Sequence, residues 1–68
     1  MSTTQTYTVT GMTCGHCVAS VTEEVQEIPG VENVDVVLET GSLTLTSAEP
    51  VDDAAVQAAV EEAGYQLA

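Results

Sequence analysis

The sequence contains no lysine and no arginine, whereas eleven of its residues are aspartate or glutamate. With the single histidine neutral, the formal net charge is −11 at pH 7. This balance argues against nucleic-acid binding, because phosphate contacts require basic side chains, and anionic membranes would repel such a surface. A partner that docks electrostatically would have to present a basic face; the alternative is that the acidity only keeps a small protein soluble and monomeric.

Tryptophan and phenylalanine are also absent, and tyrosine occurs only twice. Hydrophobic residues still make up 44% of the 68 positions, and most of them are valine, alanine and leucine. This composition predicts one folded domain spanning residues 1–68, with residues 1–4 as a frayed N-terminus. So small an aliphatic core leaves little space for a large substrate pocket, so we do not expect an enzyme.

Long hydrophobic runs are missing as well. The opening MSTTQTYTVT has neither the basic region nor the apolar stretch of a secretory signal. No apolar run approaches the roughly 20 residues needed to cross a bilayer. We therefore expect a cytoplasmic protein that does not insert into membranes. Thiols stay reduced in that compartment, so a close cysteine pair there indicates metal or redox chemistry rather than a structural disulfide.

Hydrophobic spacing predicts the elements of the first half of the chain. Apolar and polar side chains alternate over residues 5–10, which is typical of a strand. Apolar residues then recur at helical spacing from Val18 to Ile28. We expect Pro29-Gly30 to end this helix directly after Ile28.

The second half of the chain shows the same two patterns. Residues 31–38 and 42–46 alternate on either side of Gly41, which predicts a hairpin whose inner face includes Leu38. A second helix is expected to begin at an N-cap Asp52 and to stop at Gly64, before a short last strand. The predicted order βαββαβ is that of an α+β, ferredoxin-like fold, a four-stranded antiparallel sheet with both helices on one face.

The chain's only cysteines and its only histidine lie together in GMTCGHC, residues 11–17. Cys14 would lie in the loop after the first strand and Cys17 in the first turn of the first helix, so both sulfurs can face one point. Free N–H groups and the positive helix end stabilise thiolates there, so we expect lowered thiol pKa values. Two soft sulfur ligands with few further donors suit Cu(I) better than a four-ligand structural zinc site.

The run GMTCGHC between a strand and a helix resembles the GMTCxxC motif of the heavy-metal-associated domain family. The Gly41 turn and the closing Ala63-Gly64-Tyr65 also match that family, so the resemblance covers essentially the whole chain. Length, His16 and Tyr65 most resemble its CopZ-type bacterial copper chaperones.

The resemblance implies that Cys14 and Cys17 bind Cu(I) for copper homeostasis. It implies delivery, by ligand exchange, to the soluble domains of a copper-transporting P-type ATPase, with a copper-sensing repressor as a second candidate partner. Some relatives carry basic residues near the site for docking. This sequence has none, so their docking polarity is not carried over.

Four neighbouring residues are candidates for tuning the cysteine pair. Met12 would fill the core or serve as a thioether ligand. His16 would act as a third ligand, tune the thiolates, take part in a metal-bridged dimer, or remain a passive surface residue. Tyr65 would pack on the loop or hydrogen-bond a sulfur. Gly15 would serve the backbone of a tight loop.

Two other functions remain open from the sequence. Mercuric and other soft ions also bind paired thiolates, so a mercury- or other soft-metal-binding carrier is the first alternative. A dithiol oxidoreductase using Cys14 and Cys17 is the second. We further expect the apo protein to be a monomer and copper to bridge two copies into a weak homodimer, which eleven negative charges per chain oppose.

Overall fold

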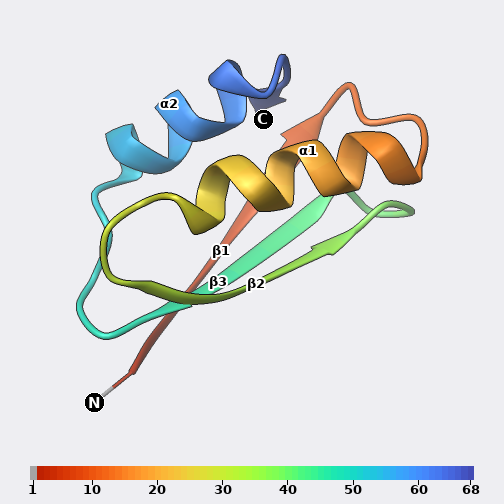
Figure 1. Ribbon diagram of the computed structural model, residues 1–68. Helices are drawn as coiled ribbons and strands as arrows, with labels where there is room; N and C mark the ends of the chain where they lie inside the picture. Colours follow the sequence, from red (N-terminus) through yellow and green to blue (C-terminus); the bar gives the residue numbers. More distant parts are fainter. Residues whose placement is uncertain (1) are drawn as a thin grey trace.

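The computed structural model describes residues 2–68, and Met1 lies outside the described residues. These residues form β1 (Thr3–Thr10), α1 (Gly15–Gln26), β2 (Val31–Val37), β3 (Ser42–Ser47), α2 (Asp53–Glu62) and β4 (Gln66–Leu67). The strands pair antiparallel in the order β2-β3-β1-β4, and both helices cover one face of the sheet (Figure 1). The predicted ferredoxin-like fold is confirmed.

Strand β1 is longer than the sequence pattern indicated. Thr3 and Thr4 pair with Ser47 and Thr46 of β3, so the expected frayed segment 1–4 overlaps the sheet at these two positions. Alternate side chains of β1 point toward the helices, and Val9 is the most buried of them. The extra residues gain order because a paired strand satisfies their backbone groups.

The core lies between the sheet and the two helices. It is formed by Val9, Val21, Val25, Leu43, Leu45, Val56 and Val60. Helix α1 contributes positions four apart, 21 and 25, and so does α2, 56 and 60, which is the spacing of one helix face. Because every member is valine or leucine, the core is small and aliphatic, as the composition predicted.

Helix α1 ends at Gln26, two residues before the predicted end. The last turn tightens: the Glu27 N–H donates to the Glu24 carbonyl at 3.3 Å and the Ile28 N–H to the Val25 carbonyl at 3.1 Å. Both bonds span three residues, the pattern of a 3₁₀ turn. Ile28 precedes Pro29, whose ring disfavours helical backbone at the residue before it, so helical geometry is lost before Ile28.

The predicted inner position of Leu38 is wrong. Strand β2 ends at Val37, and the Gly41 N–H donates to the Val37 carbonyl at 2.9 Å, which closes the turn. Leu38 therefore lies in the turn rather than in the strand, and 39% of its surface is exposed. Alternation predicts a buried face only while the chain stays in the sheet.

Two side chains of β1 fasten the start of α2. The Gln5 amide holds both backbone groups of Val51: its nitrogen donates to the Val51 carbonyl at 2.9 Å and its oxygen accepts from the Val51 N–H at 2.8 Å. The Tyr7 hydroxyl donates to the Asp53 carboxylate at 2.6 Å. Asp52 is the N-cap, as predicted, and accepts from the Ala54 N–H at 3.1 Å.

Helix α2 ends in a Schellman motif at the predicted Gly64. The Tyr65 N–H donates to the Val60 carbonyl at 3.0 Å and the Gly64 N–H to the Glu61 carbonyl at 2.9 Å. Gly64 has a φ of 97°, a left-handed value that favours glycine. This turn sends the chain back toward the end of β1.

Within residues 2–68, no helix has the length and apolar character needed to cross a membrane.

Candidate metal centre

The loop that carries the cysteines leaves β1 at Gly11. Gly11 has a φ of 93°, so a residue with a side chain would be strained there. A Cβ at this position would also lie 3.5 Å from the Tyr65 ring, in ordinary contact. Gly11 therefore turns the chain out of the sheet directly beside Tyr65, and the loop and the end of α2 are brought together.

Cys14 and Cys17 stand at the start of α1. Cys14 is the N-cap, and its carbonyl accepts from the Cys17 N–H at 3.1 Å and the Val18 N–H at 3.4 Å. Cys14 is exposed, whereas Cys17 is buried in the first turn. Their Sγ atoms lie 3.6 Å apart, well beyond a disulfide bond of about 2.05 Å, so both are free thiols.

Cys17 lies in a set of hydrogen-bond donors that stabilise its thiolate. The Thr13 backbone N–H is the largest influence, the Tyr65 hydroxyl is the next, and the Cys14 backbone and thiol add to them. Burial opposes these donors because it disfavours the charged form. Together they lower the pKa of Cys17 from 9.0 to about 6, so its sulfur is mainly thiolate at neutral pH.

Thr13 is a site residue that sequence reasoning missed. Besides its backbone N–H, its Oγ1 atom lies 3.8 Å from the Cys17 Sγ atom. The loop folds back so that Thr13, four residues before Cys17, faces the same sulfur. The only sequence signal was its place next to Cys14 within GMTCGHC.

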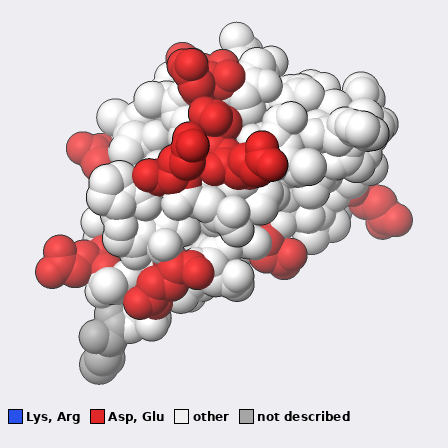
Figure 2. Space-filling model, in the orientation of Figure 1, with Lys and Arg blue, Asp and Glu red and all other residues white. Residues whose placement is uncertain are grey.

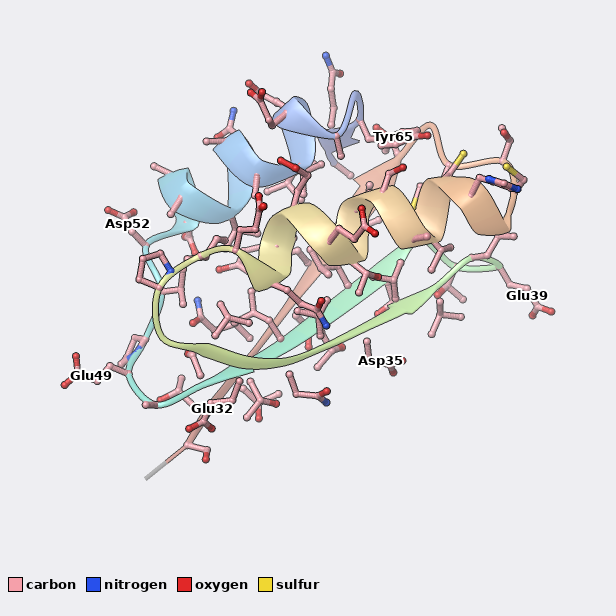
Figure 3. All side chains as sticks on the ribbon, viewed as in Figure 1. Glu32, Asp35, Glu39, Glu49, Asp52 and Tyr65 are labelled. Carbon is pink, nitrogen blue, oxygen red and sulfur yellow. The ribbon has the colours of Figure 1, made fainter. Side chains whose placement is uncertain are left out.

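Tyr65 reaches the site from the end of α2. Figure 3 shows its side chain directed toward the loop at the start of α1, where the sulfur atoms lie. Tyr65 is half-buried and packs against the core. Its interaction with Cys17 is the largest reason that the pKa of Tyr65 is raised, because a nearby thiolate favours the protonated hydroxyl.

The other predicted tuning residues are placed differently. Met12 is partly buried and packs against the hydrophobic core. His16 is exposed, and Gly15 opens α1 with no atom near the position of a Cβ. No group of three His, Cys, Asp or Glu side chains that could hold a metal occurs in residues 2–68. The described part of the chain thus offers two sulfurs without a third clustered ligand.

This arrangement can bind a soft ion and release it. The Cys17 sulfur is held within the protein and the Cys14 sulfur faces solvent, so an incoming thiolate from another molecule can approach an ion bound between them. Residues 2–68 contain no pocket in which a small-molecule substrate could lie beside the sulfurs.

Comparison with known proteins identifies the family of this chain. The heavy-metal-associated domain profile matches residues 6–66. The chain is 38% identical over 65 residues to the copper chaperone CopZ of Bacillus subtilis (strain 168), covering 94% of each chain. A solved structure of a CopZ metallochaperone superimposes with a TM-score of 0.90 at 31% identity, covering 97% of this chain and 100% of that one.

Larger proteins contain similar segments. The chain is 40% identical over 63 residues to copper-transporting ATPase 1 of Rhizobium meliloti (strain 1021), covering 93% of this chain but 8% of the ATPase. It is 36% identical over 61 residues to mercuric reductase of Shigella flexneri, covering 90% of this chain and 11% of the reductase. From the profile match, the loop geometry and these relatives together, the chain belongs to the heavy-metal-associated domain family.

Proposed function

We propose that this chain is a cytoplasmic carrier of Cu(I) that binds the ion through Cys14 and Cys17. The observation that carries the proposal is the pair of free sulfurs 3.6 Å apart at the start of α1. The relationship to copper chaperones of about the same length supports a carrier rather than an enzyme.

The donor set supports the monovalent state of copper. Thiolates are soft ligands, and they favour Cu(I) over hard cations. Structural zinc usually takes four protein ligands, and no third His, Cys, Asp or Glu joins the sulfurs in residues 2–68. Met12 is partly buried and packs against the hydrophobic core, so we do not propose its thioether as a ligand.

The unequal burial of the two cysteines supports transfer by ligand exchange. Cys14 is exposed and Cys17 is buried, so a partner's thiolate meets the ion on the Cys14 side. A copper-transporting P-type ATPase is the proposed acceptor, because its segment similar to this chain is expected to carry a comparable site. A copper-sensing repressor is the second proposed partner. With no lysine or arginine in this chain, either partner would need to supply the basic face.

The binding site is tested by anaerobic titration with Cu(I) against a calibrated chelator, followed by mass measurement of the intact complexes. The wild type should take up one ion per chain at low copper. Cys14→Ser combined with Cys17→Ser should abolish binding and keep the far-ultraviolet circular dichroism. Ser20→Ala is the matched control on the same helix. Tight binding by the double variant would show that the sulfurs are not the ligands.

Mercury is the second candidate cargo, because mercuric reductase carries a similar segment. Two thiolates suit Hg(II) as well as Cu(I), so affinity measured in the tube does not identify the biological ion. Induction of the protein in its own cells by copper, mercury or zinc salts does. Induction by mercury alone would replace copper as the cargo.

Self-association is proposed to depend on the metal. The apo chains repel one another through their net charge of −11, whereas two exposed Cys14 sulfurs could share an ion. Sedimentation should show an apo monomer and a weak dimer after copper is added. A stable dimer without metal would contradict this expectation.

A further inference from the structure

Acidic side chains of the two helices lie close enough for their charges to act on one another. Three of them, Glu23, Glu24 and Glu27, belong to α1 and its C-cap, and Glu62 is the last residue of α2. We call these four residues the acidic ridge. Figure 2 shows a cluster of acidic side chains on the helical side of the molecule, with no basic side chain among them.

The ridge has no local compensation. Neither helix carries a basic residue in its last turn, although the helix dipole there is negative and favours cations. Glu62 occupies this unfavourable end of α2. Because the chain has no lysine or arginine, no side chain of that type can move in to neutralise it.

Glu24 is the residue of the acidic ridge whose pKa is affected by the other three charges. It is half-buried, whereas Glu23, Glu27 and Glu62 are exposed. Its pKa is raised, first because burial disfavours the carboxylate and then because of the charges of Glu27, Glu62 and Glu23. Since Glu62 comes from the other helix, part of this repulsion appears only when α1 and α2 pack together.

The opposing force is a small apolar contact. Val21 and Val25 of α1 and Val56 and Val60 of α2 are fully buried in the same core. Each of these side chains is modest in size, so the hydrophobic contribution to the helix packing is limited. Helix packing therefore balances limited apolar burial against repulsion that dissolved ions can screen.

We propose that the fold of this protein depends on dissolved salt: the acidic ridge weakens the packing of α2 on α1 in dilute solution, and cations at high ionic strength restore it. Charges are screened beyond about 30 Å at 0.01 M ionic strength but beyond about 3 Å at 1 M. At 1 M ionic strength, dissolved ions therefore screen the charges of the acidic ridge from one another. The chain is thus suited to a medium of high ionic strength.

This inference is independent of the proposed copper function. It concerns the apo chain and involves neither cysteine. The experiment uses no metal, so its failure would leave the metal site untouched, and loss of the copper proposal would leave the salt dependence standing.

The proposal is tested by thermal unfolding of the reduced apo chain at neutral pH. Unfolding is monitored by circular dichroism in sodium chloride from about 0.01 M to about 1 M. The midpoint should rise by ~10 °C or more for a domain of this size. Sucrose, which stabilises by exclusion from the surface without screening charge, is the solvent control. A midpoint that does not rise with salt, or that rises no more than in sucrose, would overturn the proposal.

Matched variants assign the effect to the ridge. Glu24→Gln and Glu62→Gln should each raise the midpoint in dilute solution by roughly 5 °C and reduce its rise with salt. Glu49→Gln removes the same charge at the turn before α2, where Figure 3 shows the side chain directed away from the helices, and should change both much less. If Glu49→Gln has the same effect as the two ridge variants, net charge rather than the ridge is responsible and the proposal is wrong.

Discussion

The two tyrosines of this protein make the same kind of contact at opposite ends of α2, with different consequences. At the start of the helix, the Tyr7 hydroxyl donates to the Asp53 carboxylate and accepts from the Gln5 amide. At the far end, the Tyr65 hydroxyl acts on the Cys17 sulfur and lowers its pKa. Each contact joins α2 or the residues directly after it to another part of the fold.

The two tyrosines differ in the anion that each contacts, which is the Asp53 carboxylate for Tyr7 and the Cys17 thiolate for Tyr65. Asp53 is a carboxylate at the start of a helix, where the dipole also favours it. Burial, and after it the contact with Asp53, raises the pKa of Tyr7 to about 12. Cys17 is a thiolate beside a second, exposed thiol. The first interaction joins β1 to the start of α2, whereas the second acts on a sulfur that lies beside an exposed cysteine.

The largest expected effect is at the Cys17 end. Cys17→Ser replaces a soft thiolate by a hydroxyl that stays protonated at neutral pH, so Cu(I) affinity should fall by several orders of magnitude. The change is measured by competition with a chelator. Tyr7→Phe, at the other end, should bind copper like the wild type. A comparable loss in Tyr7→Phe would mean that the two ends are not separate in function.

The next effect is on stability at the Tyr7 end. Tyr7→Phe removes the hydroxyl that contacts Asp53 and should cost about 1 kcal/mol of unfolding free energy, the usual net value of a hydrogen bond. This corresponds to a drop of roughly 4–8 °C in the unfolding midpoint. Scanning calorimetry measures it, with Thr6→Val on the open face of the same strand as the control. An unchanged midpoint would show that the contact does not hold α2.

The third expected effect is that the stability of the fold depends on pH through the Cys17 thiol. Because the folded pKa of Cys17, about 6, is below its ordinary value of 9.0, the folded state binds fewer protons between these values. The stability that results is fully present above pH 9 and is lost as the pH falls through about 6. The unfolding midpoint of the reduced apo protein should therefore rise over this range. Cys17→Ser should lack the rise, and an identical rise in that variant would assign it to another group.

The smallest expected effect is at Tyr65. Tyr65→Phe removes the second largest of the influences that lower the pKa of Cys17, so this pKa should move part of the way back toward its ordinary value. The Thr13 backbone N–H, the largest influence, remains. Thiolate absorbance followed against pH measures the shift, and Tyr7→Phe is the matched control. If Tyr65→Phe leaves the titration unchanged, the hydroxyl does not act on the sulfur.

Most of the fold could be predicted because its signals are local. The alternation of residues 5–10, the spacing from Val18 to Val25 and the stop at Gly64 each depend on neighbours along the chain. The errors arose where local signals compete. Leu38 fits the alternation of β2 but follows the residue at which the Gly41 turn closes. Helix α1 ends before Ile28, because the ring of Pro29 also restricts the residue that precedes it.

The candidate site could be predicted only in part. The spacing of Cys14 and Cys17 places both at the start of one helix, so their proximity follows from local geometry. Thr13 was missed because its importance comes from a loop that folds back onto Cys17, which no spacing rule describes. The burial of Met12 and the exposure of His16 depend on the core beneath the loop.

The amino-acid sequence by itself determined the elements, the close pair of cysteines and the uncompensated negative charge. These depend on side-chain chemistry and on spacing within one helix or strand. Only the tertiary structure decided that Tyr65 influences the pKa of Cys17 and that the charge of Glu62 raises the pKa of Glu24. Both interactions join residues far apart in the chain, and they exist only after burial of the valine and leucine core has brought α2 against α1 and the loop.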